Sequence, residues 1–183
     1  MLGFLQMFIQ PSQTHCDLTI STQDQHWLEY ALILADKAQQ QGEIPVGAVL
    51  VSADGEILGE GWNETISKND PTAHAEIQAI RMAADKIQNY RLLDTTLYVT
   101  LEPCPMCAGA ILHSRIGRLV FGAMDYKTGA VGSRYHLFED YKMNHALHIR
   151  GGVLAEQCGQ KISQFFKQRR LEKKLLKQQA VEK

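Results

Sequence analysis

The sequence predicts an α/β fold, a three-layer α/β/α sandwich with a mixed sheet of roughly five strands. Segments with apolar residues at helical spacing alternate with short runs rich in Val, Leu and Ile, which favours a sheet covered by helices on both faces. The first two of these runs are joined by Asp54-Gly55, a typical hairpin signal. The hairpin adds an antiparallel pair to strands otherwise connected through helices, so a mixed sheet is expected.

The first helix is expected from Gln25 to Gln41, because apolar residues recur there at helical spacing and Gly42 follows as a stop. The hairpin strands are expected at residues 46–51 and 56–62. A polar loop follows. Asp70-Pro71 is then expected to open a second helix, with Asp as N-cap and Pro as the first helical residue.

The second half of the chain continues the alternation. Pro103 is expected to start a third helix that ends near Ser114. The other expected elements are strands at residues 96–101 and 118–123, short helical pieces within 125–144, a last strand at 148–153 and a long helix at 154–178.

Length and composition suit one domain, with 183 residues of which 45% are hydrophobic and 21% charged. Residues 1 to about 22 are expected to form an N-terminal extension with a disordered start, and residues 23–183 a single domain. No run of about 18 apolar residues predicts a membrane span. The apolar N-terminus lacks the basic segment of a leader, and four cysteines are too few for a disulfide scaffold. A reducing, cytoplasmic compartment is therefore expected.

The net charge of −1 hides a basic C-terminus. Residues 161–183 hold eight Lys or Arg against two Glu, a net charge of +6, so the rest of the chain carries −7. Such a helix is either an ordinary solvated face or a surface that attracts phosphate, and charge alone favours the solvated face.

Three residues in two motifs have the character of a metal site. Cys104 and Cys107 form a C-x-x-C pair in the first turn of a predicted helix, where their side chains share one face. The helix dipole there favours thiolate, the form that binds zinc. His74, in H-A-E at another predicted helix start, is the candidate third ligand. Three protein ligands leave a position open for water, which is typical of catalytic zinc sites.

Glu76 follows His74 by two positions and is the candidate proton carrier. Side chains at a helix start lean towards its N-terminus, so both residues can border one cavity there. A carboxylate that does not bind the metal can take a proton from water and deliver it to a leaving group. The plainer interpretation of Glu76 is an acidic residue favoured in a first helical turn. That interpretation leaves an open zinc site without a proton carrier.

These motifs belong to a wider pattern. PTAHAEIQAI and TLEPCPMCAGAI, together with IPVGAVLV, GEGWN, KTGAVGS and FFKQRR, resemble the cytidine/deoxycytidylate deaminase superfamily, and within it the bacterial tRNA-specific adenosine deaminases. The resemblance covers about residues 25–170. It implies a cytidine deaminase-like fold and one zinc ion per subunit. It also implies hydrolytic deamination of the wobble adenosine of an arginine tRNA to inosine, with release of ammonia, by a homodimer whose two subunits both bind RNA.

The resemblance also implies roles for single residues. His74, Cys104 and Cys107 correspond to the zinc ligands, and Glu76 to the proton shuttle. The residues that correspond to substrate contacts are Asn63 and the backbone of Ala75 at the flipped base, and Asp125 at the target ribose. Phe165 and Phe166, with Arg169 and Arg170, fall in the helix that approaches the anticodon stem-loop, and Phe166, Arg169 and Arg170 are the expected contacts there.

Two other functions are compatible with the residues alone. A deaminase of a free base or nucleoside, of the guanine or cytosine type, would use the same zinc centre, and a zinc protein without activity could bind RNA. The basic tail favours RNA over a small molecule, and Glu76 favours an enzyme. Asn63 could instead cap a turn, and Asp125 could cap a helix. Phe165 and Phe166 belong to an apolar stripe that favours the core, so at most one of them is expected to be free to stack on a base.

Overall fold

The computed structural model describes residues 21–140 and 145–181. Most of the expected N-terminal extension, residues 1–20, therefore lies outside the described residues, as do 141–144 and 182–183. The end of that expected extension belongs to the first helix. Ser21 is its N-cap, and the Ser21 hydroxyl accepts a hydrogen bond from the Asp24 N–H at 3.0 Å.

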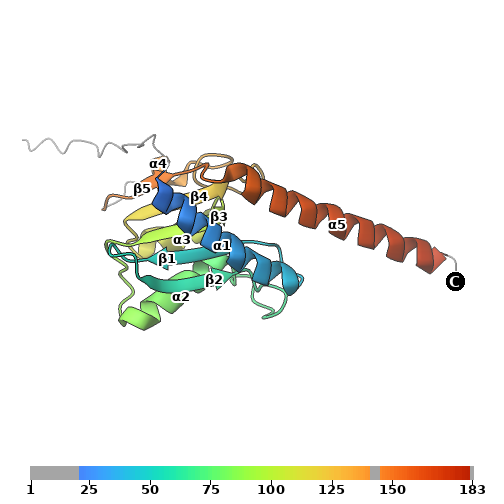
Figure 1. The fold of residues 1–183 in the computed structure, drawn as a ribbon, viewed down its shortest axis with the longest axis horizontal. Coiled ribbons are helices and arrows are strands. Elements are labelled where there is room, and N and C mark those ends of the chain that lie inside the picture. The colour runs from blue at the N-terminus through green and yellow to red at the C-terminus, as the bar shows by residue number, and fades with distance from the viewer. Residues whose placement is uncertain (1–20, 141–144, 182–183) are drawn as a thin grey trace, which may run out of the picture.

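Helices and strands alternate along the described chain as predicted (Figure 1). The elements are α1 (Thr22–Gln40), β1 (Gly47–Val51), β2 (Ile57–Trp62), α2 (Ala75–Ile87), β3 (Thr96–Leu101), α3 (Pro105–His113), β4 (Arg118–Ala123), α4 (Leu137–Asp140), β5 (His148–Arg150) and α5 (Ala155–Val181). The last strand is shorter than the predicted 148–153, because Gly152 takes a positive φ of 87° and ends the extended backbone.

The five strands form one mixed sheet in the order β2-β1-β3-β4-β5, which confirms the predicted fold class. β1 pairs antiparallel with both β2 and β3, whereas β3, β4 and β5 are parallel. It follows that β2, β3 and β4 all end at the same edge of the sheet. The loops after these strands, which begin with Asn63, Glu102 and Met124, are therefore brought together at that edge.

Successive side chains along each strand point to opposite faces of the sheet, and they pack into two hydrophobic cores, one on each face. In β3, Leu97 and Val99 face the core that includes α2 and α3, while Tyr98 faces the core that includes α1 and Cys158 of α5. Helices thus cover both faces, as Figure 1 shows for α1 in front of the sheet and α2 behind it. This arrangement is the predicted three-layer sandwich.

Close contact between β2 and α2 depends on Gly61. A Cβ at this position would lie 2.0 Å from the Ala75 carbonyl oxygen and 2.6 Å from the Ala79 nitrogen. Only a residue without a side chain lets the first turn of α2 rest directly on the strand. The start of α2 is thereby fixed against the sheet.

The final helix, α5, runs away from the sheet, and its C-terminal half projects beyond the rest of the molecule (Figure 1). Phe165 is 8% exposed and is the last buried residue along α5, among those whose side chains are described. In the part of the chain that the structure describes, no helix is long and apolar enough to cross a membrane.

Candidate metal centre and active site

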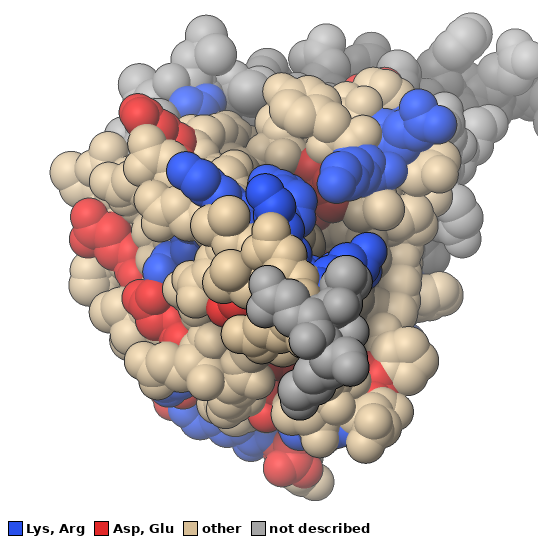
Figure 2. All heavy atoms as spheres, turned by 90° about the vertical axis from the view of Figure 1, so that its right-hand side faces the viewer, with Lys and Arg blue, Asp and Glu red and all other residues tan. Residues whose placement is uncertain are grey.

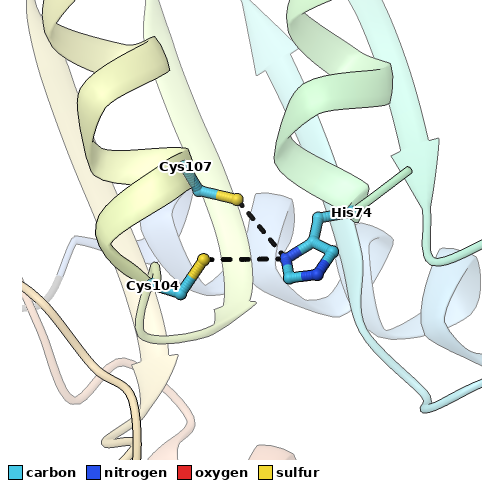
Figure 3. Close-up of side chains that lie close together, drawn as sticks. All are labelled: His74, Cys104 and Cys107. Carbon is cyan, nitrogen blue, oxygen red and sulfur yellow. Dashed lines mark hydrogen bonds between the residues drawn. The ribbon is translucent and has the colours of Figure 1, made fainter. Parts of the chain in front are cut away.

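His74, Cys104 and Cys107 converge at the starts of α2 and α3. The Nδ1 atom of His74 lies 3.7 Å from Sγ of Cys104 and 3.5 Å from Sγ of Cys107. Figure 3 shows both sulfur atoms pointing at this one ring nitrogen. The three donor atoms all lie within 4.8 Å of one another. The structure therefore brings together the three residues that the sequence singled out.

Helix caps place these ligands, and two of the predicted helix starts are wrong in detail. His74 is the N-cap of α2, and Cys104 is the N-cap of α3. Asp70-Pro71 does not open α2, because Asp70 closes a local turn in which its Oδ1 accepts from the Thr72 N–H at 2.8 Å. Likewise Pro105, not Pro103, is the first residue of α3.

Both caps have extended backbone, and neither uses its own side chain to cap the helix. The imidazole and the thiol are thus free for a ligand, while the positive ends of two helices point at the cluster. Two sulfurs and one imidazole nitrogen are the donor set that Zn²⁺ prefers, and the three atoms fit a single ion. No fourth His, Cys, Asp or Glu joins this cluster among residues 21–140 and 145–181. The set therefore matches a catalytic zinc site, in which one position stays open.

Without a metal ion, the three side chains of the cluster share protons, and Cys104 is the one that loses its proton most readily. A hydrogen bond from the Cys107 thiol, with help from His74, lowers the pKa of Cys104 to about 4. The same shared proton and burial raise the pKa of Cys107. The contact with Cys104 raises the pKa of His74. A bound divalent cation deprotonates its thiol ligands outright, which would remove the difference between the two cysteines.

Glu76 is the second residue of α2 and is 4% exposed. Burial raises its pKa to about 6, the nearby Cys104 adds to the rise, and His74 opposes it. A carboxyl group with a pKa in this range can both accept and release a proton near neutral pH. Glu76 is thus a buried titratable group beside the metal ligands and is not one of them.

Asn63 is 7% exposed and joins the end of β2 to the start of α2. Its Oδ1 accepts from the Ala75 N–H at 3.0 Å, and its Nδ2 donates to the Ile44 carbonyl at 3.1 Å. Asn63 therefore caps α2 in place of the His74 side chain. One N–H of its amide has no partner in these two bonds and remains for a further acceptor.

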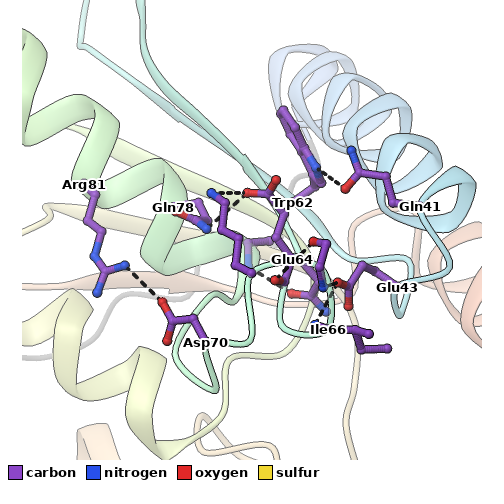
Figure 4. A network of polar contacts seen from close by, with 12 residues as sticks. Gln41, Glu43, Trp62, Glu64, Ile66, Asp70, Gln78 and Arg81 are labelled. Carbon is purple, nitrogen blue, oxygen red and sulfur yellow. Dashed lines mark hydrogen bonds and ion pairs between the residues drawn. The ribbon is translucent and has the colours of Figure 1, made fainter.

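The loop between Asn63 and His74 is held by Glu43, which is fully buried. Its Oε1 accepts from the N–H groups of Ile66 and Ser67, both at 2.8 Å. Figure 4 shows this carboxylate among the polar contacts of the loop, which continue through Glu64 to Gln78 of α2. The loop that precedes α2 is thus anchored by a buried acid.

The loop after β4 is held by a second buried acid, Glu102, which is 2% exposed. Its carboxylate accepts from main-chain N–H groups between Asp125 and Ser133. Burial acts to raise the pKa of Glu102, but hydrogen bonds from Ser133, Asp125 and Gly132 outweigh it and hold the pKa below its usual value. The Asp125 side chain stabilises the turn that begins at Asp125, since its Oδ1 accepts from the Lys127 N–H at 2.9 Å.

The predicted RNA contacts of α5 lie on its exposed part. Phe166 is 37% exposed, whereas the ring of Phe165 is buried. The Lys127 ammonium lies 5.9 Å from the centre of the Phe166 ring, so the loop after β4 contacts α5. Arg169 and Arg170 are exposed, and Arg169 pairs with Glu172 at 3.5 Å. Seen from the side to which α5 projects, Lys and Arg gather in the upper half of the molecule (Figure 2).

Sequence reasoning missed Glu43 and Glu102. A signal existed for Glu102, because it stands between an apolar strand and a proline, where an acid is buried only if it is paired or hydrogen-bonded. The identity of its partners carried no signal, since they are main-chain N–H groups of a distant loop.

Comparison with known proteins agrees with this site. The sequence profile of the cytidine and deoxycytidylate deaminase zinc-binding region matches residues 21–123, more than half of the chain. Fold, ligand set and buried acid together define a zinc-dependent hydrolytic deaminase. The chain belongs to the cytidine and deoxycytidylate deaminase family, in its branch of bacterial tRNA-specific adenosine deaminases.

The relatives cover most of the chain. The tRNA-specific adenosine deaminase of Haemophilus influenzae is 68% identical over 154 residues, which are 84% of this chain and 89% of the relative. That of Bacillus subtilis is 44% identical over 153 residues, covering 84% of this chain and 94% of the relative. A solved structure from a study of A-to-I editing by tRNA:A34 deaminases has a TM-score of 0.71 and 44% identity, and covers 74% of this chain and 98% of its own.

A guanine deaminase shares the fold at lower similarity. The Bacillus subtilis enzyme has a TM-score of 0.54 and 37% identity, and the match covers 66% of this chain and 76% of that one. A fold of this kind thus occurs in a protein named as a guanine deaminase as well as in one named as a tRNA deaminase, so the fold alone does not identify the base.

Proposed function

We propose that this protein converts adenosine at the wobble position of a tRNA anticodon, in an arginine tRNA, to inosine and ammonia. The observation that carries the proposal is a three-ligand His/Cys/Cys cluster beside the buried Glu76, in a chain 68% identical to a tRNA-specific adenosine deaminase. A tRNA substrate also agrees with the cytoplasmic compartment expected from the sequence.

The reaction adds water across the N1–C6 double bond of adenine and then breaks the bond between C6 and its exocyclic amine. His74, Cys104 and Cys107 would hold one zinc ion, which supplies Lewis acidity towards water at neutral pH. Glu76 takes a proton from the attacking water and delivers it to the ring nitrogen, and a second proton reaches the leaving amine by the same carboxylate. One water is consumed and one ammonia is released for each inosine formed.

The residues around the cluster would receive the nucleotide. The target adenosine must leave its stack, and an unpaired anticodon loop lowers that cost. We assign Asn63 to the flipped base, through the amide N–H that its bonds to Ala75 and Ile44 leave over, with the Ala75 main chain beside it. We assign Asp125 to the target ribose, as the family resemblance implies.

The exposed part of α5 would bind the RNA around the target. Phe166 offers a ring for stacking, and Arg169 and Arg170 offer cations for phosphates. This surface favours RNA over free guanine, since a small base needs neither a projecting helix nor its net positive charge. We further propose a homodimer, as the family resemblance implies, with both subunits contacting one RNA. Light scattering on the purified protein should then give twice the mass of one chain.

The function is tested by incubating the protein with an arginine tRNA that bears adenosine at the wobble position. We expect one inosine per tRNA and one ammonia per inosine, and no product when that position is guanosine. Release of ammonia from free guanine, with no inosine from the tRNA, would contradict the proposal and favour a free-base deaminase.

A further inference from the structure

Glu102 receives five hydrogen bonds from a single loop. Its Oε1 accepts from the N–H groups of Val131, Gly132 and Ser133 at 2.9, 2.9 and 3.0 Å. Its Oε2 accepts from the Asp125 N–H at 3.0 Å and from the Ser133 hydroxyl. Both ends of the segment 125–133 are thus fastened to one carboxylate.

The loop that Glu102 fastens is the one that carries proposed RNA contacts. Asp125 stands at its start, and Lys127 reaches the ring of Phe166 on α5. Glu102 itself lies at the end of β3, two residues before the metal ligand Cys104. One side chain therefore connects the strand that leads to the metal with the loop and helix that face the RNA.

Gly129 gives independent support for this connection. A Cβ at Gly129 would lie 2.4 Å from both Cδ and Oε2 of Glu102, and 2.6 Å from the Asp125 carbonyl oxygen. The loop is thus wrapped around the carboxylate so closely that no side chain fits between them. Loop and acid form one unit.

We propose that Glu102 is a positioning residue. By binding both ends of the loop 125–133, it holds the loop in the conformation in which Asp125 and the Lys127–Phe166 pair contact the RNA. The inference rests on the proposed function. Glu102 acts through the loop and does not touch the reacting atoms, so it governs RNA affinity more than the rate of the chemical step.

Glu102→Gln is the sharpest change, because an amide has only one oxygen. If that oxygen replaces Oε1, the amide NH₂ faces the Asp125 N–H, and in the other orientation it faces three N–H groups of Val131, Gly132 and Ser133. Either way a buried donor loses its acceptor, and the loop must move to satisfy it. The volume of the side chain is unchanged.

The experiment measures zinc content, the Kd for an anticodon stem-loop and the single-turnover rate constant at saturating RNA. For Glu102→Gln we expect the Kd to rise about tenfold or more, the rate constant to change less than about threefold, and zinc to stay near one per chain. Asp24→Asn is the matched control, because it also neutralises a buried acid, but at Arg118, the opposite end of β4. It should lower stability and leave the Kd unchanged.

An unchanged Kd in Glu102→Gln overturns the inference, and so does an equal rise in Kd in Asp24→Asn. Parallel loss of zinc, rate and binding also overturns it, because that pattern describes general unfolding. If Glu102→Gln does not fold, Ser133→Ala decides, since it removes one donor and keeps the acid; we expect its Kd to rise about twofold to fivefold, and no rise contradicts the proposal. A parent protein that makes no inosine from the stem-loop contradicts the proposed function instead.

Discussion

The Nδ1 atom of His74 lies 3.5 Å from Sγ of Cys107, although 33 positions separate the two residues in the sequence. Each is held at the start of a helix, and the two helices follow strands that end at the same edge of the sheet. The metal site is therefore a product of the sheet topology. Its ligands meet only because β1 runs antiparallel to both of its neighbours.

Removing one thiol should remove the metal. We expect Cys104→Ala to lose most of its zinc, because two remaining ligands bind the ion too weakly, and elemental analysis of the purified protein measures this directly. Cys158→Ala is the matched control, since Cys158 is a buried free thiol outside the cluster. Full zinc occupancy in Cys104→Ala would show that this ligand assignment is wrong.

Replacing the proton carrier should stop turnover and leave binding intact. In Glu76→Ala we expect single-turnover deamination to fall by at least about 10²–10⁴-fold, because one carboxylate serves several proton transfers. Zinc content and the Kd for the stem-loop should stay near those of the parent. A rate constant within about tenfold of the parent would exclude Glu76 from this role.

Filling the contact between β2 and α2 should destabilise the fold. In Gly61→Ala the new methyl group would collide with the main chain of α2, so we expect a loss of about 3 kcal/mol or more in the free energy of unfolding, measured with urea. Gly159→Ala in α5 is the control, because its Cβ would lie 3.9 Å from the Ala123 Cβ, an ordinary contact. Equal stability of the two variants would contradict the close packing of α2.

The ion pair of Asp24 and Arg118 should make stability depend on pH. The two terminal guanidinium nitrogens of Arg118 donate to the Asp24 carboxylate, at 2.6 and 2.8 Å, and the Tyr98 hydroxyl donates to it at 3.1 Å. Burial opposes ionisation, but these bonds prevail and lower the pKa of Asp24 below its ordinary value. This stability is therefore complete above the pKa of the unfolded chain, about 3.9, and is lost as the pH falls through the lower folded-state pKa.

Asp24→Asn tests this linkage. We expect it to cost about 2 kcal/mol at pH 7, less than for a fully buried pair, because the Arg118 side chain is 35% exposed. The difference between parent and variant should shrink steadily below about pH 4. Urea unfolding across that range is the measurement, and a difference that does not change with pH would contradict the account.

The arginines of α5 should contribute to the salt dependence of RNA binding. Arg169→Ala with Arg170→Ala should raise the Kd for the stem-loop at low salt and reduce the salt slope by up to about one unit per lost phosphate contact. Lys37→Ala with Lys86→Ala removes the same charge from α1 and α2 and should change the slope less. If the parent and the arginine variant give superimposable salt curves, Arg169 and Arg170 do not contact the RNA and are ordinary solvated residues.

The sheet was the most predictable part of the fold. Apolar runs bounded by turn residues predicted β3 and β4 to the residue, and Asp54-Gly55 marked the hairpin. Helix starts were less predictable, because Asp followed by Pro suits a local turn as well as an N-cap. Asp70 makes the turn, and α2 begins only at Ala75.

Of the site, the metal ligands could be predicted because their spacing is itself the chemical signal. The loops could not, since Glu102 binds main-chain N–H groups that every residue type provides. Phe166 was expected to be the contact, and it is the more exposed of the two rings, but the local pattern alone does not fix which ring of Phe165 and Phe166 is buried. That depends on where α5 leaves the sheet, a feature of packing and not of local pattern.

The central claim is that the zinc centre acts on adenosine held in an RNA loop. The most direct test compares kcat/KM for inosine formation from a short anticodon stem-loop with that from free adenosine. We expect rapid deamination of the stem-loop and little of the nucleoside, because binding by Phe166, Arg169 and Arg170 is available only to RNA. Comparable kcat/KM values for the two substrates would contradict the account.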